Sequence, residues 1–262
     1  MKYSESDLNI LIGCVRDAGQ AVFNMAKNGF RTAYKQNQDP VTTADLKADK
    51  ILKETLLEKF PETGWLSEET VDDPSRLDKE YIWIVDPIDG TKEFVSSIPE
   101  YAVSVALVQN GVPVLAAVYN PAAGQMFTAM KDSGAWLNDK SILSERNLAE
   151  KPLILASRSE VKRGEFEQFE NLARIRPCGS IAYKLALIAA GQADATFSLG
   201  PKNEWDIAAG VLLIQEAHGK VGDKYGKDFA FNRKNTLVDG IVGTTKQAYE
   251  SIRKMLNSSA GI

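Results

Sequence analysis

Residues 81–94 read Y-I-W-I-V-D-P-I-D-G-T-K-E-F, an apolar run that ends directly in two carboxylates, Asp86 and Asp89. A run this rich in aromatic and β-branched residues predicts a central strand of a sheet, and ligand sites of α/β proteins gather beyond the carboxyl ends of such strands. Pro87 fixes one backbone angle and Gly90 permits unusual ones, so this turn can bring both carboxylates to one point. Two unpartnered carboxylates there would repel each other, and a divalent cation removes this cost.

The region around this strand divides into helices and short strands. Apolar residues recur at helical spacing over 4–28 and 43–59, which predicts two helices. Short β-type runs begin at Trp65, Tyr81, Tyr101, Val112 and Gln125. Asn110-Gly111 is a hairpin signal, so the strands on either side of it are expected to be adjacent and antiparallel. Residues 1–150 are therefore expected to form an α+β half, with helices packed on a largely antiparallel sheet.

After Lys151-Pro152 the pattern alternates strands with helices. The expected strands are 153–156, 174–178 and 195–199, and the expected helices are 162–173, 180–190, 206–217 and 245–257. This alternation predicts an α/β half over 151–262, in which helices cover a second sheet. The chain has no internal repeat and no low-complexity linker, so we expect the two halves to form one body.

The composition is that of an ordinary soluble globular protein of 262 residues, 44% hydrophobic and 25% charged. The formal net charge of −4 and the lack of a Lys/Arg run argue against nucleic acid as a partner. Cys14 and Cys178 are too few for a disulfide framework, which fits a reducing compartment. Without a signal-like N-terminus or an apolar run near ~18 residues, we expect a cytoplasmic protein with no transmembrane segment. A homodimer and peripheral membrane association stay open.

Further carboxylates stand at the ends of other expected elements. They are Asp39 and Asp45 at the second helix, Glu68 and Glu69 after the strand at 65, and Asp206 at the head of the helix over 206–217. Each has a structural alternative, as a helix cap, a first-turn acid or a solvated loop. Together they offer oxygen ligands only, because His218 is the single histidine and is expected at a helix C-terminus. Such a set favours Mg²⁺, or Mn²⁺, over Zn²⁺.

An acidic pocket of this kind suits an anionic substrate, because bound cations reverse its local sign. Thr91 offers a hydroxyl, and the amides of Gly90 and Thr91 can hold a phosphate oxygen if a helical turn begins there. Metal-assisted hydrolysis of a phosphoester would use the cations to activate a water and to stabilise the leaving oxygen.

Four ordered motifs resemble the inositol monophosphatase superfamily of Mg²⁺-dependent, lithium-sensitive phosphatases, over nearly the whole chain. The motifs are D-P-V-T-T-A-D at 39–45, W-L-S-E-E-T at 65–70, D-P-I-D-G-T at 86–91 and W-D-I-A-A-G at 205–210. The resemblance implies a layered αβαβα sandwich of the sugar-phosphatase type and two to three Mg²⁺ ions.

The resemblance also implies a role for each motif residue. The implied metal ligands are Glu68, Asp86, the carbonyl of Ile88, Asp89 and Asp206, with Asp86 shared between two ions and Glu68 also supporting a third. Thr91 with Asp45 would orient and deprotonate the attacking water.

Within the superfamily, several positions are similar to the CysQ-type 3'(2'),5'-bisphosphate nucleotidases. Lys92-Glu93-Phe94 follows the D-G-T turn, where the inositol enzymes usually continue with Thr-Asn-Phe. Ser198 stands near the position of a Glu that grips inositol hydroxyls in those enzymes. Glu204 is acidic but directly precedes the W-D pair, so we do not expect it to substitute.

The similar nucleotidases hold their substrate with a Gly-rich turn and a Lys. The implied substrate-binding residues are Asp89, Gly90, Thr91, Ser157, Gly179, Ser180, Lys184 and Asp206, with Arg158 following Ser157. A Lys that reaches out to solvent from a helix edge is the alternative for Lys184. Glu160 stands where some of these relatives have His, which leaves the contacts to the base open.

The leading expectation is therefore a phosphatase that removes the 3'-phosphate of adenosine 3',5'-bisphosphate to give AMP and phosphate, and that acts on the sulfated form too. An inositol monophosphatase or a fructose-1,6-bisphosphatase of the same superfamily is the alternative. A non-catalytic binding protein is disfavoured, because the sequence retains all four metal carboxylates, Glu68, Asp86, Asp89 and Asp206.

Overall fold

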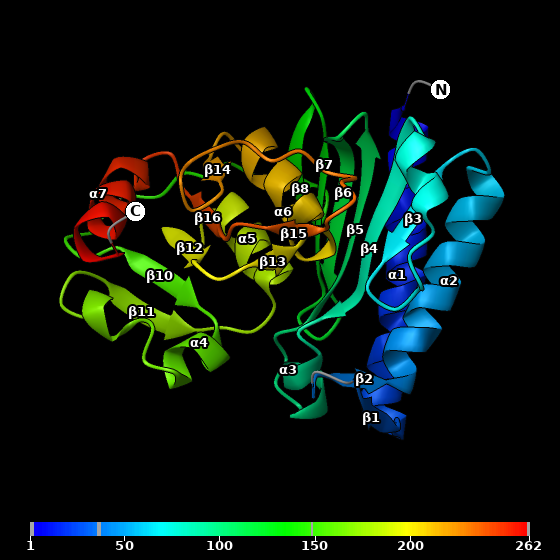
Figure 1. The fold of residues 1–262 in the computed structure, drawn as a ribbon, viewed down its shortest axis with the longest axis horizontal. Helices are drawn as coiled ribbons and strands as arrows, with labels where there is room; N and C mark the ends of the chain where they lie inside the picture. The colour runs from blue at the N-terminus through cyan, green and yellow to red at the C-terminus, as the bar shows by residue number, and fades with distance from the viewer. Residues whose placement is uncertain (1–2, 36–37, 148, 261–262) are drawn as a thin grey trace.

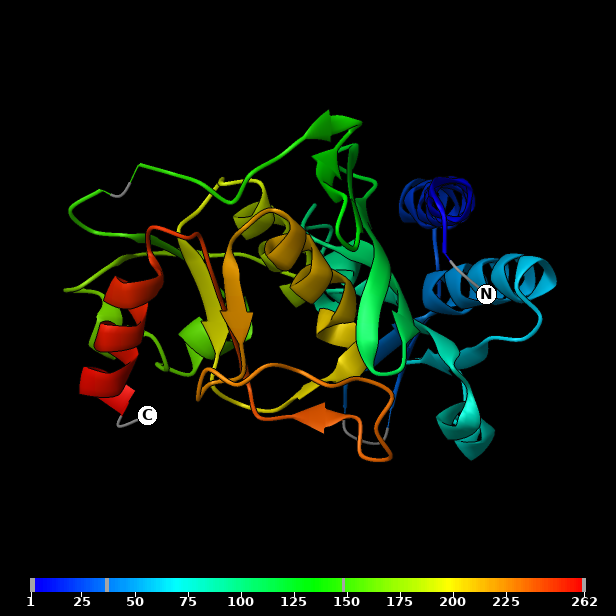
Figure 2. The same ribbon diagram turned by 90° about the horizontal axis from the view of Figure 1, so that it is seen from above.

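Helices and sheets alternate in five layers in this computed structural model, which describes residues 3–35, 38–147 and 149–260 (Figure 1). Three buried apolar clusters join the layers: one beneath the two N-terminal helices, one around the middle helices, and one beneath the last helix. The N-terminal helices and the C-terminal helix lie at opposite ends of the molecule (Figure 2). The layers are those of the αβαβα sandwich expected from the sequence.

The first half pairs two long helices with a sheet. The helices are α1 (Glu5–Asn28) and α2 (Thr43–Lys59). The antiparallel strands β1 (Thr32–Tyr34) and β2 (Pro40–Thr42) lie between them in the sequence. The sheet contains, in spatial order, β3 (Gly64–Ser67), β4 (Tyr81–Asp89), β5 (Ala102–Gln109), β6 (Val112–Asn120), β7 (Gln125–Met130), β8 (Gly134–Leu137) and β9 (Lys140–Ser141). Only the first pair is parallel, so the sheet is largely antiparallel as expected. Asn110 and Gly111 have φ of 48° and 83°, as a two-residue hairpin requires.

The apolar run of β4 is continuous because both faces of the strand are covered. Ile82 and Ile84 belong to the cluster around the middle helices, whereas Trp83 and Val85 belong to the cluster beneath α1 and α2. Each of these four side chains is at most 1% exposed. Burial of one such side chain contributes about 1.5–3 kcal/mol. β4 lies second from the edge of the sheet, between β3 and β5, rather than at its centre.

The second half forms another sheet with helices on both faces. Its strands, in spatial order, are β11 (Arg174–Pro177), β10 (Leu153–Ala156), β12 (Ala195–Ser198), β16 (Ile241–Thr244) and β14 (Lys220–Gly222). The middle helices are α5 (Ile181–Ala189) and α6 (Glu204–Glu216), and the outer helix is α7 (Tyr249–Ala260). The first three strands run parallel, so their carboxyl ends share one edge of the sheet.

One predicted helix is wrong. Instead of a helix over 162–173, the structure has the short α4 (Arg158–Lys162), a turn, and the single 3₁₀ turn η2 (Glu167–Phe169). Gly164 in this turn has φ of 79°, a left-handed conformation that ends a helix. Phe166 and its neighbours then pack as an aromatic cluster under α7 instead of lining one helix face.

Two other helix boundaries also differ from the prediction. The helix expected from 206 begins at Glu204, and the one expected from 245 begins at Tyr249. Thr245 is fully buried and its amide donates to the carbonyl of Asp194, so it continues the sheet region instead of starting the helix. The remaining elements are η1 (Pro74–Asp78), α3 (Thr91–Val95) and the two-stranded pair of β13 (Lys202–Asn203) with β15 (Leu237–Val238). In the described ranges, no helix has both the length and the apolar character needed to span a bilayer.

Candidate active site

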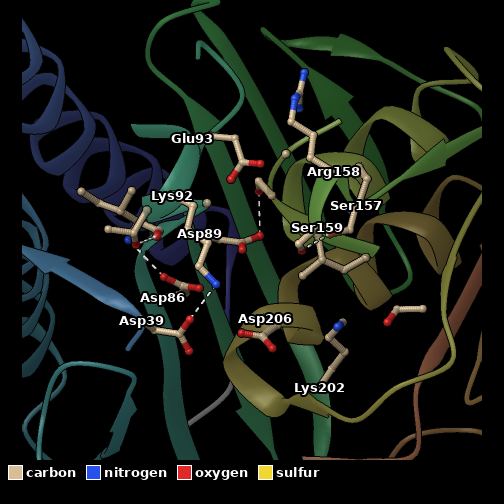
Figure 3. Close-up of a pocket in the computed structure, with 18 of the residues that line it drawn as sticks. Asp39, Asp86, Asp89, Lys92, Glu93, Ser157, Arg158, Ser159, Lys202 and Asp206 are labelled. Atoms are coloured by element: carbon tan, nitrogen blue, oxygen red, sulfur yellow. Dashed lines mark hydrogen bonds and ion pairs between the residues drawn. The ribbon is translucent and has the colours of Figure 1, made fainter. Parts of the chain in front are cut away.

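A cavity of about 680 Å³ opens between the two sheets. It lies where the carboxyl end of β4, the start of α5 and the start of α6 meet the loops that follow β10 and β11. Figure 3 shows the carboxyl groups of Asp86, Asp89 and Asp206 turned toward the same space. The structure thus brings together three carboxylates that are up to 120 residues apart in the sequence numbering, 86 to 206.

The end of β4 is shaped by an irregular register between Asp86 and Asp89. The Asp86 carboxylate accepts a hydrogen bond from the amide of Ile88 at 3.0 Å, which fixes the turn. Gly90 has φ of 92°, and a Cβ at this position would lie 3.0 Å from the carbonyl oxygen of Glu100. The turn therefore needs glycine, and α3 begins directly after it at Thr91.

Asp89 connects the two halves of the site. Its Oδ2 accepts hydrogen bonds from Ser180 Oγ and from the amide of Ala182, both at 2.6 Å. These bonds hold the start of α5 against the end of β4. Gly179, which precedes them, has no room for a side chain, because a Cβ would lie 2.4 Å from Glu93 Cγ.

Asp206 lies in the first turn of α6 and accepts a hydrogen bond from the amide of Asn203 at 2.8 Å, so it also closes a capping box. Burial, followed by the charge of Asp89, raises the pKa of Asp206 to about 8. Burial also raises the pKa of Asp89 to about 6, and burial with the charge of Glu68 raises that of Asp86. The carboxylates are close enough to disfavour one another's ionisation.

Thr91 and Asp45 form a pair behind the carboxylates. Thr91 Oγ1 lies 3.1 Å from Asp45 Oδ1 and 2.9 Å from the carbonyl oxygen of Ile88, so it can donate to one of them at a time. The other oxygen of Asp45 accepts from the amide and hydroxyl of Thr42, the residue that caps α2. Burial raises the pKa of Asp45, which favours its protonated form.

Glu68 follows β3 and is paired with a lysine that the sequence did not indicate. Lys35 Nζ lies 2.8 Å from Glu68 Oε1 and 2.8 Å from Glu69 Oε1. Burial raises the pKa of Glu69 to about 7. Lys35 stands in a short polar segment before α2, where a single lysine carries no periodic signal, and its partners are more than thirty residues away.

The donor chemistry of these residues fits hard divalent cations. Every candidate ligand offers oxygen, and the raised pKa values of Asp86, Asp89 and Asp206 show that their ionised forms are disfavoured, a cost that a bound cation would remove. No three acidic, histidine or cysteine side chains in the described parts of the chain form a closed metal-binding group by themselves. Asp89 is held toward Ser180, so any ligand set would include groups besides side-chain carboxylates, such as a backbone carbonyl or water.

The opposite wall of the cavity comes from the second half. Lys184 lines the cavity with only 3% of its surface exposed, and its Nζ lies 3.4 Å from the carbonyl oxygen of Cys178. Burial lowers the pKa of Lys184. Lys184 is therefore enclosed along its whole length, and the alternative of a lysine reaching to solvent is wrong.

Ser157 and Arg158 lie on this wall at the carboxyl end of β10. Arg158 pairs with Glu100 and turns away from the three aspartates in Figure 3. Glu100 also accepts a hydrogen bond from the amide of Gly179 at 2.8 Å, so it ties the loop after β11 to the first half. Ser157 and Ser159 line the cavity with their hydroxyls 2.9 Å apart.

Glu160 and Lys202 complete this wall, and sequence reasoning did not place them together. Glu160 Oε1 accepts from Ser198 Oγ at 2.5 Å and lies 3.3 Å from Lys202 Nζ. Glu204, by contrast, is fully buried away from the cavity and accepts from the amides of residues 232 and 233. As expected, it does not substitute for an acid at Ser198.

The alternating layers and the acidic cavity at the end of β4 are the architecture of the sugar-phosphatase class. A family model described as "Inositol monophosphatase family" matches residues 4–260, and the chain belongs to this family. It is 36% identical to an inositol-1-monophosphatase from Rhizobium meliloti, over 84% of this chain and 86% of that protein. It is 33% identical to the Nus factor SuhB of Vibrio cholerae, over 96% and 97% of the two chains.

Solved structures give the same assignment. An IMPase from Thermotoga maritima has a TM-score of 0.87 at 27% identity and covers 98% of both chains. The chain is thus a phosphatase of the inositol monophosphatase family, which agrees with the resemblance carried by the four sequence motifs.

Proposed function

We propose that this phosphatase removes the 3'-phosphate of adenosine 3',5'-bisphosphate and releases AMP and inorganic phosphate. The observation that carries the proposal is the distribution of charge in the cavity, where five of the seven lining carboxylates come from the first half and four of the five lining basic residues come from the second. The basic residues of the second half are Arg158, Lys162, Lys184 and Lys202. A substrate with two phosphates matches this division, with the reacting phosphate near the carboxylates and their cations and the second phosphate near the lysines.

Mg²⁺ ions are the proposed cofactors. Among the described residues that line the cavity, seven carboxylates face five basic groups, and two divalent cations would reverse this excess of negative charge. The proposed ligands are Glu68, Asp86, the carbonyl of Ile88, Asp89 and Asp206. When bound, the cations would supply the positive charge that admits a phosphate and the acidity that activates a water.

Thr91 and Asp45 would handle the proton of the attacking water. While Thr91 Oγ1 donates to Asp45, its lone pairs are able to accept a hydrogen bond from a water in the cavity. Asp45 is buried, and burial raises its pKa, which favours the uptake of a proton by its carboxylate. The turn at Gly90 and Thr91 would hold a phosphate oxygen with its amides, as we expected from the sequence.

Hydrolysis of an inositol monophosphate is the second candidate function. The observation that favours it is Glu160, whose carboxylate lies beside Ser198. Ser198 stands near the position where the inositol enzymes carry an acid. The name of the Rhizobium meliloti relative points the same way. Lys184 and Lys202 would suit the second phosphate of a nucleotide substrate, whereas the Glu160 carboxylate on the same wall would suit the hydroxyl groups of a polyol such as inositol.

Phosphate release in Mg²⁺ separates these functions. The substrates are adenosine 3',5'-bisphosphate, inositol 1-phosphate and fructose 1,6-bisphosphate, compared by kcat/KM. We expect the nucleotide to be preferred, and we expect Lys202→Met to raise its KM while leaving KM for 3'-AMP, which lacks the second phosphate, nearly unchanged. A clear preference for inositol 1-phosphate would overturn the nucleotidase proposal.

A further inference from the structure

Glu160 is a buried carboxylate in the cavity wall that the phosphate chemistry does not use. It lies in α4, lines the same cavity as Asp86, Asp89 and Asp206, and exposes only 4% of its surface. A carboxylate so enclosed is costly unless hydrogen-bond donors satisfy both of its oxygens. The arrangement of its partners therefore indicates what the cavity is built to bind.

The partners of Glu160 satisfy one oxygen. Oε1 accepts from Ser198 Oγ at 2.5 Å and lies 3.3 Å from Lys202 Nζ. Oε2 is buried and has no hydrogen-bond partner among the residues that the structure describes. An ionised carboxylate only accepts hydrogen bonds, so Oε2 calls for a donor from a bound molecule.

The charges beside Glu160 restrict the kind of donor. Lys184 and Lys202 line the same wall, so the cluster combines two ammonium groups with one carboxylate. A phosphate placed directly against Glu160 would be repelled, because both groups are negative. A sugar hydroxyl both donates and accepts, so it can bond to the carboxylate and to a lysine at once.

Lys202 is the neighbour of Glu160 that a substrate can displace. Its side chain is 23% exposed and reaches Glu160 through the single 3.3 Å contact, whereas Ser198 and Lys184 are buried. Movement of this one ammonium group would free an acceptor position on Oε1 of the carboxylate.

We propose that Glu160 is a specificity-determining residue whose carboxylate accepts a hydrogen bond from a sugar hydroxyl of the substrate. The hydroxyl belongs to a ribose if the nucleotidase function proposed above holds, on which this arm of the inference rests. It belongs to a cyclitol ring if the substrate is an inositol phosphate. In both cases the bond selects substrates that carry a hydroxyl at one fixed distance from the reacting phosphate.

The test compares substrate pairs that differ in ring hydroxyls. One pair is adenosine 3',5'-bisphosphate with its 2'-deoxy analogue, and the other is inositol 1-phosphate with cyclohexyl phosphate. For the protein with Glu160, we expect one pair to show a kcat/KM ratio of at least about tenfold, since a site built to bond a hydroxyl rejects analogues without it. Glu160→Met, which cannot accept a hydrogen bond, should bring this ratio to within about threefold of unity by slowing the hydroxylated substrate.

Two further variants keep the test decisive. Glu160→Gln preserves the shape of the side chain and removes its charge, so it should give an intermediate kcat/KM ratio. If Glu160→Met does not fold, the ratio measured with Glu160→Gln tests the role of Glu160. Glu165→Gln is the matched control, because Glu165 is an exposed carboxylate paired with Arg163 and does not line the cavity. It should leave the ratio unchanged.

The outcomes separate this inference from the proposed function. If the nucleotide pair is hydrolysed and both Glu160 variants keep its ratio, the role of Glu160 is overturned and the nucleotidase stands. If only the cyclitol pair is hydrolysed with a ratio that depends on Glu160, the nucleotidase is overturned and the role of Glu160 stands. Equal slowing of both members of a pair would mean that Glu160 merely supports the wall, and would also overturn the inference.

Discussion

Asp89 has two roles at the scale of single residues, because it carries negative charge into the cavity and also holds the start of α5. Its Oδ2 accepts from Ser180 and from the amide of Ala182, and burial raises its pKa to about 6. An amide side chain has one oxygen that can keep these hydrogen bonds but lacks the charge that a cation requires. The two roles can therefore be separated by a single substitution.

Asp89→Asn is expected to lower Mg²⁺-dependent phosphate release by at least about a hundredfold. Changing a residue that only supports a metal ligand typically costs about 10–100-fold, and Asp89 is proposed to be a ligand itself. The circular dichroism spectrum should stay unchanged, because the amide oxygen retains the bonds to α5. Asp39→Asn is the control: Asp39 lines the same cavity in a half-exposed pair with Lys92, and this change should alter activity by no more than about threefold. Near-normal turnover of Asp89→Asn would show that the ligand assignment is mistaken.

Thr91 offers a test of the proton path. Thr91→Ala removes the hydroxyl that joins the cavity to Asp45 and should lower kcat by about a hundredfold, as is typical when acid–base assistance is lost. Thr91→Ser keeps the hydroxyl and should stay within about tenfold of the unmodified protein. Because alanine is a good first residue for α3, the melting temperature serves as the check on folding. Equal losses for both variants would argue against a role for the hydroxyl.

At the scale of elements, the close contact between α5 and α6 positions two parts of the cavity. α5 carries the residues bonded to Asp89, and α6 carries Asp206 in its first turn. The helices approach at Gly210, where an added Cβ would lie 2.5 Å from Leu185 Cδ1 and 2.6 Å from Leu185 Cβ. This glycine, the last residue of the W-D-I-A-A-G motif, thus serves helix packing.

Gly210→Ala is expected to destabilise the protein by about 1–3 kcal/mol, since overpacking forces the two helices apart. Gly13→Ala is the matched control, because Gly13 also lies inside a helix but a Cβ there would meet nothing within 4 Å. The control should stabilise α1 by about 0.5–1 kcal/mol. Urea unfolding monitored by fluorescence measures both changes, and a stabilising effect of Gly210→Ala would contradict the packing account.

The elements also show where sequence patterns succeed. The predictions for α1, α2 and β4 are confirmed because apolar periodicity reports a face that is buried against a neighbour. The prediction of a helix over 162–173 failed because apolar side chains packed on one aromatic cluster can come from a turn as easily as from a helix. The φ of Gly164 decides between them, and the sequence does not record it.

In the candidate site, too, some features could be predicted from the sequence and others could not. The acidic motifs were visible because each follows the end of an element, and the topology brings Asp86, Asp89 and Asp206 to one cavity. The contact of Glu160 with Ser198 was not visible, because it depends on β10 and β12 being parallel neighbours whose carboxyl ends meet. Such a contact spans 38 residues and leaves no local pattern.

At the scale of the whole molecule, the gathering of carboxylates links stability to pH. Burial raises the pKa of Asp89 to about 6 and of Asp206 to about 8, above the value near 4 in an unfolded chain. Groups with a raised pKa contribute stability that is fully present below about pH 4 and is lost as the pH rises through the folded values. Without divalent cations, the folded chain should therefore weaken between about pH 4 and pH 8.

We expect the melting temperature in chelator to fall by at least a few degrees between pH 5 and pH 8. Added Mg²⁺ should raise it more at pH 8 than at pH 5, because a cation binds the ionised carboxylates of the folded state. Asp206→Asn removes one of these groups and should flatten the dependence. A melting temperature that rises steadily from pH 5 to pH 8 in chelator would contradict the proposed coupling.

The two covered faces of β4 have a consequence for hydrogen exchange. Amides within Tyr81–Asp89 lie between β3 and β5, and the side chains beside them are locked into separate apolar clusters on either side. To open this strand, both clusters have to separate, so its amides should exchange with deuterium only through global unfolding. The backbone that carries Asp86 would then be among the last parts of the molecule to open.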